Sequence, residues 1–166
     1  MGQLFTRPSG GEFSVREAAA VAATYVAQSP ASVYTVTIGT DSQNFDKTKM
    51  VEVIAVHRVG NGGIFFYRTN YVRLIQNLRQ KIQEETQRSL ELASEFFDEF
   101  HESLSLLGHD LDHLSIKCQI HCDVGHNGNT KAMIQEIVGW VRSLGYECAI
   151  KPDSYAASGI ANKYSK

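Results

Sequence analysis

A chain of 166 residues is long enough to bury a core of its own, and 43% hydrophobic with 20% charged residues is the composition of an ordinary globular protein. The formal net charge of -2 excludes domains that hold nucleic acid by bulk positive charge, so any such contact must be local. No apolar run approaches the roughly 20 residues that span a bilayer, and residues 1–13 lack the apolar core of a secretory signal. We therefore expect a cytoplasmic protein with no membrane partner.

The cysteines argue against a disulfide framework. There are three of them, Cys118, Cys122 and Cys148, in apolar, strand-like surroundings. Small buried side chains are the simpler interpretation, and no second ligand pair at zinc-site spacing accompanies them. With no repeat and no low-complexity tract, we expect one domain over residues 1–166, of a fold class that mixes helices and strands, and we leave the oligomeric state open.

The first predicted element is a helix over about residues 15–28, ahead of the first strand. Ser14 and Glu17 have the spacing of a capping box, in which each side chain satisfies a free amide of the first turn. The helix must end before Pro30, because the residue preceding proline avoids helical geometry.

Three strands follow in a predicted antiparallel meander. The β-branched and aromatic run 33–38 predicts a buried strand that ends near Ser42, which places Asp41 at its carboxyl end. Residues 50–59 and 64–69 predict the second and third strands on either side of a glycine-rich turn.

A long helix is predicted from about residue 72 to residue 102. Glu85 interrupts its apolar stripe, whereas Glu84 lies about 100° away on the helix surface. The stripe consists of Ile75, Leu78, Ile82, Ser89, Leu92, Phe96 and Phe100.

The last third of the chain predicts a fourth strand that ends at Asp123, a helix over about 130–144, a short fifth strand over 146–152 and a final helix after it. Thr130 or Asn129 is the predicted cap of the 130–144 helix. A meander followed by right-handed crossovers gives a mixed five-stranded sheet with helices on its faces.

Three carboxylates of this arrangement are candidates for one site. Open sheets bind ligands at the carboxyl ends of strands, where Asp41 and Asp123 lie if the first and fourth strands are adjacent and parallel. Glu85 can reach them from the helix stripe. Three like charges repel unless a cation neutralises them, and Mg²⁺ or Mn²⁺ prefers carboxylate oxygens.

Each candidate also has an ordinary structural interpretation. Asp41 is suited to an Asx-turn, Glu85 to a side chain that reaches solvent from the helix, and Asp123 to the start of a turn. Gly125 follows Asp123 and permits close approach of the backbone to a ligand. Asp153, after a proline, suits a helix N-cap.

Several motifs resemble the bacterial YkuK family, a group of ribonuclease H-like proteins. The motifs are GTDSQ (39–43), EETQRSLELA (84–93), HCDVGHNGNT (121–130) and KPDSYAASGIANK (151–163), and the likeness runs from about Val15 to the end of the chain. The resemblance implies a ribonuclease H-like α/β fold, a mixed five-stranded sheet of order 3-2-1-4-5 with helices on both faces, and Mg²⁺ or Mn²⁺ as cofactor.

The resemblance also implies roles for individual residues. Asp41, Glu85 and Asp123 match the acidic positions of ribonuclease H-like nucleases and would be both metal ligands and catalytic residues. The fourth acidic position, in the last helix, is Asn162 here, with Asp153 at the start of that helix. A neutral amide weakens a second metal. The predicted substrate contacts around the cluster are Ser42, Gln43, His121, His126, Asn127 and Lys151; His121 also suits a core histidine.

The leading hypothesis is a metal-dependent nuclease that hydrolyses phosphodiester bonds in RNA, an RNA–DNA hybrid or structured DNA. The alternative is a catalytically weak or inactive ribonuclease H-like module that binds nucleic acid, which Asn162 and the absence of a basic composition favour. A nucleotide-phosphate enzyme related to actin-like ATPases ranks last, because the chain is too short for the two domains that those enzymes pair.

Overall fold

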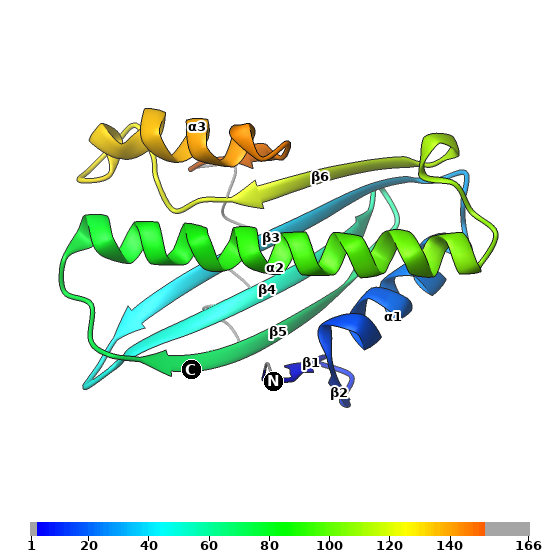
Figure 1. Cartoon of the computed structure of the whole chain (residues 1–166), viewed down its shortest axis with the longest axis horizontal. Helices are drawn as coiled ribbons and strands as arrows, with labels where there is room; N and C mark the ends of the chain where they lie inside the picture. Colours follow the sequence, from blue (N-terminus) through cyan, green and yellow to red (C-terminus); the bar gives the residue numbers. More distant parts are fainter. Residues whose placement is uncertain (1–2, 152–166) are drawn as a thin grey trace.

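The computed structural model describes residues 3–151, which form a mixed sheet with long helices packed on it (Figure 1). The strands are β1 (Phe5–Thr6), β2 (Glu12–Phe13), β3 (Val33–Asn44), β4 (Thr48–Arg58), β5 (Gly63–Val72), β6 (Ser115–His121) and β7 (Glu147–Ala149). The helices are α1 (Val15–Ala27), α2 (Leu78–Leu106) and α3 (Ile134–Ser143), with short 3₁₀ turns at Leu111–His113 and Lys131–Met133.

The sheet has seven strands in the order β2-β1-β5-β4-β3-β6-β7, so the predicted number of five strands is wrong. The five strands that were predicted, β5-β4-β3-β6-β7, are neighbours in the predicted order 3-2-1-4-5. Two-residue strands β1 and β2 extend the sheet at the β5 edge, through the pair Thr6–Tyr67. Such short strands leave no alternation in the sequence from which they could be predicted. In the remainder of the sheet, β3, β4 and β5 are antiparallel neighbours, and β6 and β7 run parallel to β3.

Several predicted boundaries need correction. Strand β6 ends at His121 instead of Asp123, and α3 begins at Ile134 instead of about residue 130, after a short 3₁₀ turn. Strand β3 continues to Asn44, because its antiparallel partner β4 pairs with it as far as Thr48. Asp41 therefore lies inside β3, although it is beyond the last parallel pair with β6, Gly39–His121. Helix α2 begins at Leu78 instead of about residue 72, because β5 extends to Val72 and the Asn77 side chain accepts the first free amide, that of Gln80, at 2.9 Å.

The helices share one face of the sheet in the described part of the chain. Helix α2 crosses the sheet, with α1 beside its carboxyl-terminal half and α3 beside its amino-terminal half (Figure 1). All three contribute to one apolar core, in which Phe96 and Phe100 stack at 5.4 Å. The same core includes Val36 and Ile38 of β3. The predicted helices on both faces are thus not found within residues 3–151, and the final predicted helix lies outside the described residues.

Local capping follows the predictions only in part. The Ser14–Glu17 capping box is present, with both hydrogen bonds at 2.9 and 3.1 Å. Thr130 precedes the turn before α3 but makes no side-chain cap there. Its hydroxyl oxygen instead accepts the Gly125 amide at 3.0 Å and closes the loop after β6.

A buried polar contact fixes α2 against β3. The hydroxyl oxygens of Thr40 and Ser89 are 2.8 Å apart, and both side chains are almost fully buried. One helical turn before Ser89 comes Glu85, and two residues after Thr40 on the strand comes Ser42, whose hydroxyl donates to the Glu85 carboxylate. The packing of α2 therefore determines where Glu85 lies relative to the β3 strand.

Candidate metal centre

The three predicted carboxylates lie together, although they come from three different elements. Asp41 is on β3, Glu85 on α2 and Asp123 just after β6, and one oxygen from each lies within 4.8 Å of the others. The strand register explains this proximity. Gly39 of β3 pairs with His121 of β6. Asp41 and Asp123 each lie two residues further along the chain from this pair. The prediction that the first and fourth predicted strands are adjacent and parallel is confirmed.

Glu85 is the most buried member of the cluster, with 4% of its surface exposed. Its Oε2 accepts the Ser42 hydroxyl, while its Oε1 is buried and has no hydrogen-bond partner among the described residues. A carboxylate oxygen left unpaired in the interior carries a desolvation penalty of several kcal/mol by order of magnitude. A bound cation would remove that penalty.

The electrostatics of the cluster favour protonation when no cation is present. The pKa of Asp41 is raised to about 6, mainly by burial and in addition by the negative charge of Asp123. The pKa of Glu85 is raised to about 8, mainly by burial; the Ser42 hydrogen bond opposes this shift, and the charges of Asp123 and Asp41 contribute to it. The site therefore contains poorly solvated carboxylates, and a nearby positive charge would stabilise their ionised forms.

These residues fit a hard divalent cation. The donors are all carboxylate oxygens, which Mg²⁺ and Mn²⁺ prefer. Acidic clusters occur on protein surfaces without any ion, but the buried and unpartnered Glu85 Oε1 is an independent observation in favour of a cation at this cluster.

One lysine already contacts the cluster. The Lys151 ammonium lies 2.7 Å from Asp123 Oδ1, and its backbone amide donates to the Val124 carbonyl at 2.9 Å. Gly125 was predicted to allow a ligand close to the backbone, but its close neighbour in the structure is the Lys151 side chain. A Cβ built on Gly125 would lie 3.0 Å from the Lys151 Cβ.

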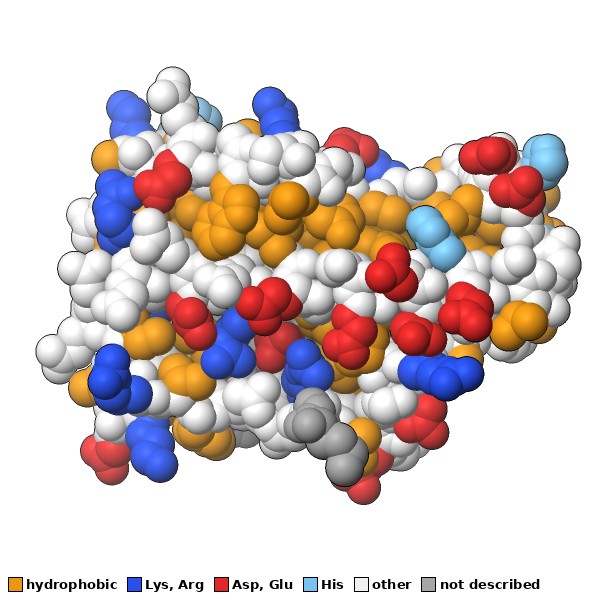
Figure 2. Space-filling view, viewed as in Figure 1, with side chains coloured by type: hydrophobic (Ala, Val, Ile, Leu, Met, Phe, Trp, Pro, Cys, Tyr) orange, Lys and Arg blue, Asp and Glu red, His pale blue; other side chains and the backbone are white. Residues whose placement is uncertain are grey.

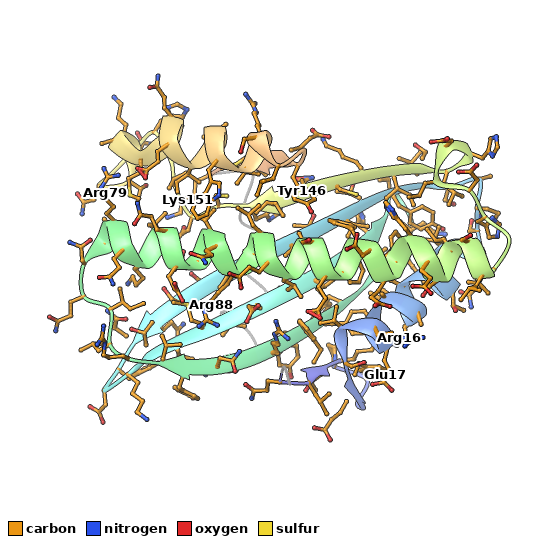
Figure 3. The ribbon with its side chains drawn as sticks, in the orientation of Figure 1. Arg16, Glu17, Arg79, Arg88, Tyr146 and Lys151 are labelled. Carbon is orange, nitrogen blue, oxygen red and sulfur yellow. The ribbon has the colours of Figure 1, made fainter. Side chains whose placement is uncertain are left out.

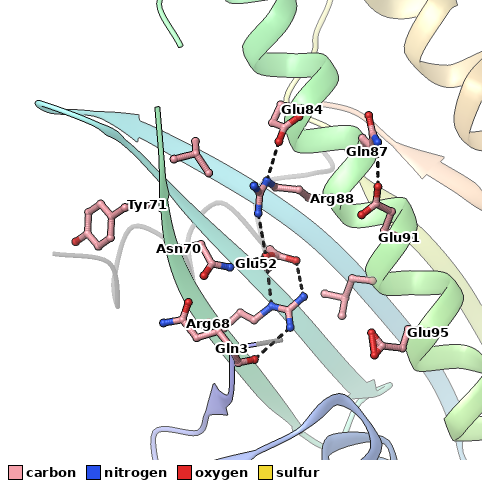
Figure 4. Close-up of a pocket in the computed structure, with 12 residues that line it drawn as sticks. Gln3, Glu52, Arg68, Asn70, Tyr71, Glu84, Gln87, Arg88, Glu91 and Glu95 are labelled. Carbon is pink, nitrogen blue, oxygen red and sulfur yellow. Dashed lines mark hydrogen bonds and ion pairs between the residues drawn. The ribbon is translucent and has the colours of Figure 1, made fainter. Parts of the chain in front are cut away.

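Glu84 takes no part in this cluster. It pairs with Arg88 at 3.1 Å, and Arg88 lies 3.8 Å from Glu52, which in turn binds Arg68 at 3.0 Å (Figure 4). These side chains line a polar cavity of about 490 Å³ between α2 and the β4–β5 strands. Sequence reasoning missed Glu52, a buried charge within an apolar strand, although a lone carboxylate in the run MVEVIAV is an unusual feature.

The remaining predicted site residues are placed as follows. Ser42 contacts Glu85, and Gln43 follows it on β3. His121, at the end of β6, is buried, whereas His126 and Asn127 are exposed in the loop that follows. Their roles as substrate contacts stay predictions. Asp153 and Asn162, the two candidates for a fourth ligand, lie outside the described residues.

Comparison with known proteins supports the ribonuclease H-like class that the fold indicates. The chain belongs to the ribonuclease H-like family, whose sequence model, described as "Ribonuclease H-like", matches residues 18–166. Within this family it is similar to "Uncharacterized protein YkuK" of Bacillus subtilis (strain 168), with 38% identity over 146 residues that cover 86% of this chain and 85% of the relative. No solved structure matches the chain. None of the helices in residues 3–151 is long and apolar enough to cross a membrane.

Proposed function

We propose that the protein is a metal-dependent nuclease that hydrolyses phosphodiester bonds with Asp41, Glu85 and Asp123 as its metal-binding residues. The observation that carries the proposal is that three carboxylates lie together and that one of them, Glu85, has a buried and unpartnered Oε1. Membership of the ribonuclease H-like family makes nucleic acid the favoured substrate class.

The three carboxylates would hold Mg²⁺ or Mn²⁺. When bound, such an ion supplies a Lewis acid for phosphate and a water of lowered pKa. The protein's own contribution is orientation. The Ser42 hydroxyl donates to one Glu85 oxygen, and the Thr40–Ser89 contact fixes the position of α2 relative to β3.

The charge distribution along α2 favours approach of a polyanion at the end that carries the cluster. Arg79 and Lys81 lie in the first turns of the helix, and Arg79 and Lys151 lie on its α3 side (Figure 3). Arg79 pairs with Glu136 of α3 at 2.6 Å, so Lys81 and Lys151 contribute most of the local positive charge. The rest of the outer surface of α2 is predominantly acidic (Figure 2), with Glu91, Glu95, Asp98, Glu99 and Glu102 in sequence. Nucleic acid would be repelled there and attracted near the carboxylates. RNA, an RNA–DNA hybrid or structured DNA would therefore bind locally, as the net charge of -2 requires.

A second candidate function is binding of nucleic acid without cleavage. It is favoured by Asn162, a neutral residue where ribonuclease H-like nucleases generally carry an acid. A neutral amide reduces the negative charge available to a second ion and hence the support for in-line displacement.

The test is a cleavage assay on a panel of an RNA–DNA hybrid, single-stranded RNA and branched DNA, with Mn²⁺ and with EDTA. The proposal expects Mn²⁺-dependent cleavage by the natural protein and its loss in Asp41→Asn and Asp123→Asn. Asp46→Asn is the matched control, because Asp46 is an exposed residue just after β3, outside the cluster. Mn²⁺ binding without cleavage of any panel member would favour the binding module. Cleavage that survives in Asp41→Asn would contradict the proposed site.

A further inference from the structure

The cluster contains a cation of its own. The Lys151 ammonium contacts Asp123 at 2.7 Å, and its positive charge also acts on Asp41 and Glu85. Three carboxylates carry a formal charge of -3, so one divalent ion together with one ammonium balances them. A pair of divalent ions would exceed the negative charge of the three carboxylates even if Lys151 moved away, and the ammonium makes that excess larger.

The backbone, and not only a flexible side chain, places Lys151 there. The chain leaving β7 runs beside the chain leaving β6, through the hydrogen bonds Cys122 N to Ala149 O and Lys151 N to Val124 O, both 2.9 Å. The Lys151 side chain then passes Gly125, where any Cβ would crowd it. The ion pair itself is partly exposed, with 53% of the lysine side chain and 31% of the aspartate side chain accessible. An isolated, exposed ion pair of that kind contributes little to stability. The important feature is therefore that this ion pair lies beside the other two carboxylates.

We propose that the Lys151 ammonium takes the position of a second cation, so that the site binds one divalent ion and not two. This inference rests on the proposed metal site and specifies its composition. It also gives Lys151 a role toward substrate. An ammonium has three N–H donors; one is used on Asp123, and the other two are available to a phosphate oxygen on the exposed side of the pair.

The experiment is a titration of Mn²⁺ into the full-length protein, followed by calorimetry, with electron paramagnetic resonance as a second readout. Two Mn²⁺ ions roughly 3.5–4 Å apart are magnetically coupled, which distinguishes a pair from two separate sites. The variants are Lys151→Met, which removes the charge and keeps the apolar stem, and Lys151→Arg, which keeps the charge. Lys131→Met is the matched control, since Lys131 is exposed in the turn before α3.

The expected result is one Mn²⁺ per chain for the natural protein, Lys151→Arg and Lys131→Met, and a coupled pair for Lys151→Met. A coupled pair already present in the natural protein would overturn the inference, as would a single ion in Lys151→Met. Absence of any Mn²⁺ binding by the natural protein is a different outcome, because it would remove the metal site and the proposed function together.

Discussion

Replacing Glu85 by glutamine should change how the stability of the metal-free protein depends on pH. Glutamine has nearly the shape of glutamate and can keep a hydrogen bond with Ser42, but it does not ionise. In the natural protein the Glu85 carboxyl is 4% exposed and must lose a proton in the interior as the pH rises. The substitution removes that step and leaves the packing of α2 in place.

The size of the effect follows from the raised pKa. Burial is the main cause that raises the pKa of Glu85 from its ordinary value of 4.5 to about 8 in the folded protein. Between these values the folded protein binds more protons than the unfolded chain, so the free energy of unfolding decreases as the pH rises. At 1.36 kcal/mol per pKa unit the complete loss is about 5 kcal/mol, of which roughly 2.5 kcal/mol falls between about pH 5.5 and 7.5.

The measurement is urea unfolding in EDTA at several pH values across that interval. The natural protein should lose stability as the pH rises, and Glu85→Gln should lose about 2 kcal/mol less over the same range. Glu84→Gln is the matched control, because Glu84 pairs with Arg88 on the other side of α2. The comparison uses slopes, so a constant cost of burying the amide does not affect it. Equal slopes for the natural protein and Glu85→Gln would refute the reasoning.

Three further results are expected. Mn²⁺ at 100 times its dissociation constant should add about 2.7 kcal/mol to the free energy of unfolding and raise the melting temperature of the natural protein, and an equal rise in Asp41→Asn would contradict the site. The Mn²⁺ affinity should increase as the pH rises from about 6 to about 8, because binding requires Asp41 and Glu85 to release protons; calorimetry in buffers of different ionisation enthalpy should detect the release, and a pH-independent affinity would argue against ligation by both carboxylates. Thr40→Val should cost about 1–3 kcal/mol in urea unfolding, because it leaves the buried Ser89 hydroxyl without the partner that it has at 2.8 Å, and a negligible cost would show that this contact does not hold α2.

The proximity of the three carboxylates could be predicted because it depends on long, regular elements. The apolar runs of β3 and β6 indicate where each strand lies in the sequence. Because the two strands are parallel neighbours, Asp41 and Asp123 come together. The sequence could distinguish Glu85, on the apolar stripe, from Glu84, off the stripe, because α2 is long enough for its helical period to be unambiguous. The exact ends of β3 and α2 were not predictable, since they depend on pairing with β4 and on the length of β5.

Contacts between segments without a pattern could not be predicted. The strands β1 and β2 consist of two residues each, and their pairing is settled only by the β5 edge beside them. Lys151 was predicted to contact substrate, but its ion pair with Asp123 depends on how the chain leaves β7. Glu52 is similar, because its partners Arg68 and Arg88 come from different elements and meet it only in the folded protein.

Side-chain hydrogen bonds fix the backbone around the carboxylate cluster. Two pairs of side chains connect β3 to α2 near the site, Thr40 with Ser89 and Ser42 with Glu85. The apolar stripe of α2, including Phe96 and Phe100, packs independently of the carboxylates. The unfavourable term is therefore local and electrostatic, namely the raised pKa values of Asp41 and Glu85. The proposed divalent ion would relieve that unfavourable term locally. In the proposed nuclease, the contacts between β3 and α2 would then keep the carboxylates in position to orient a phosphate.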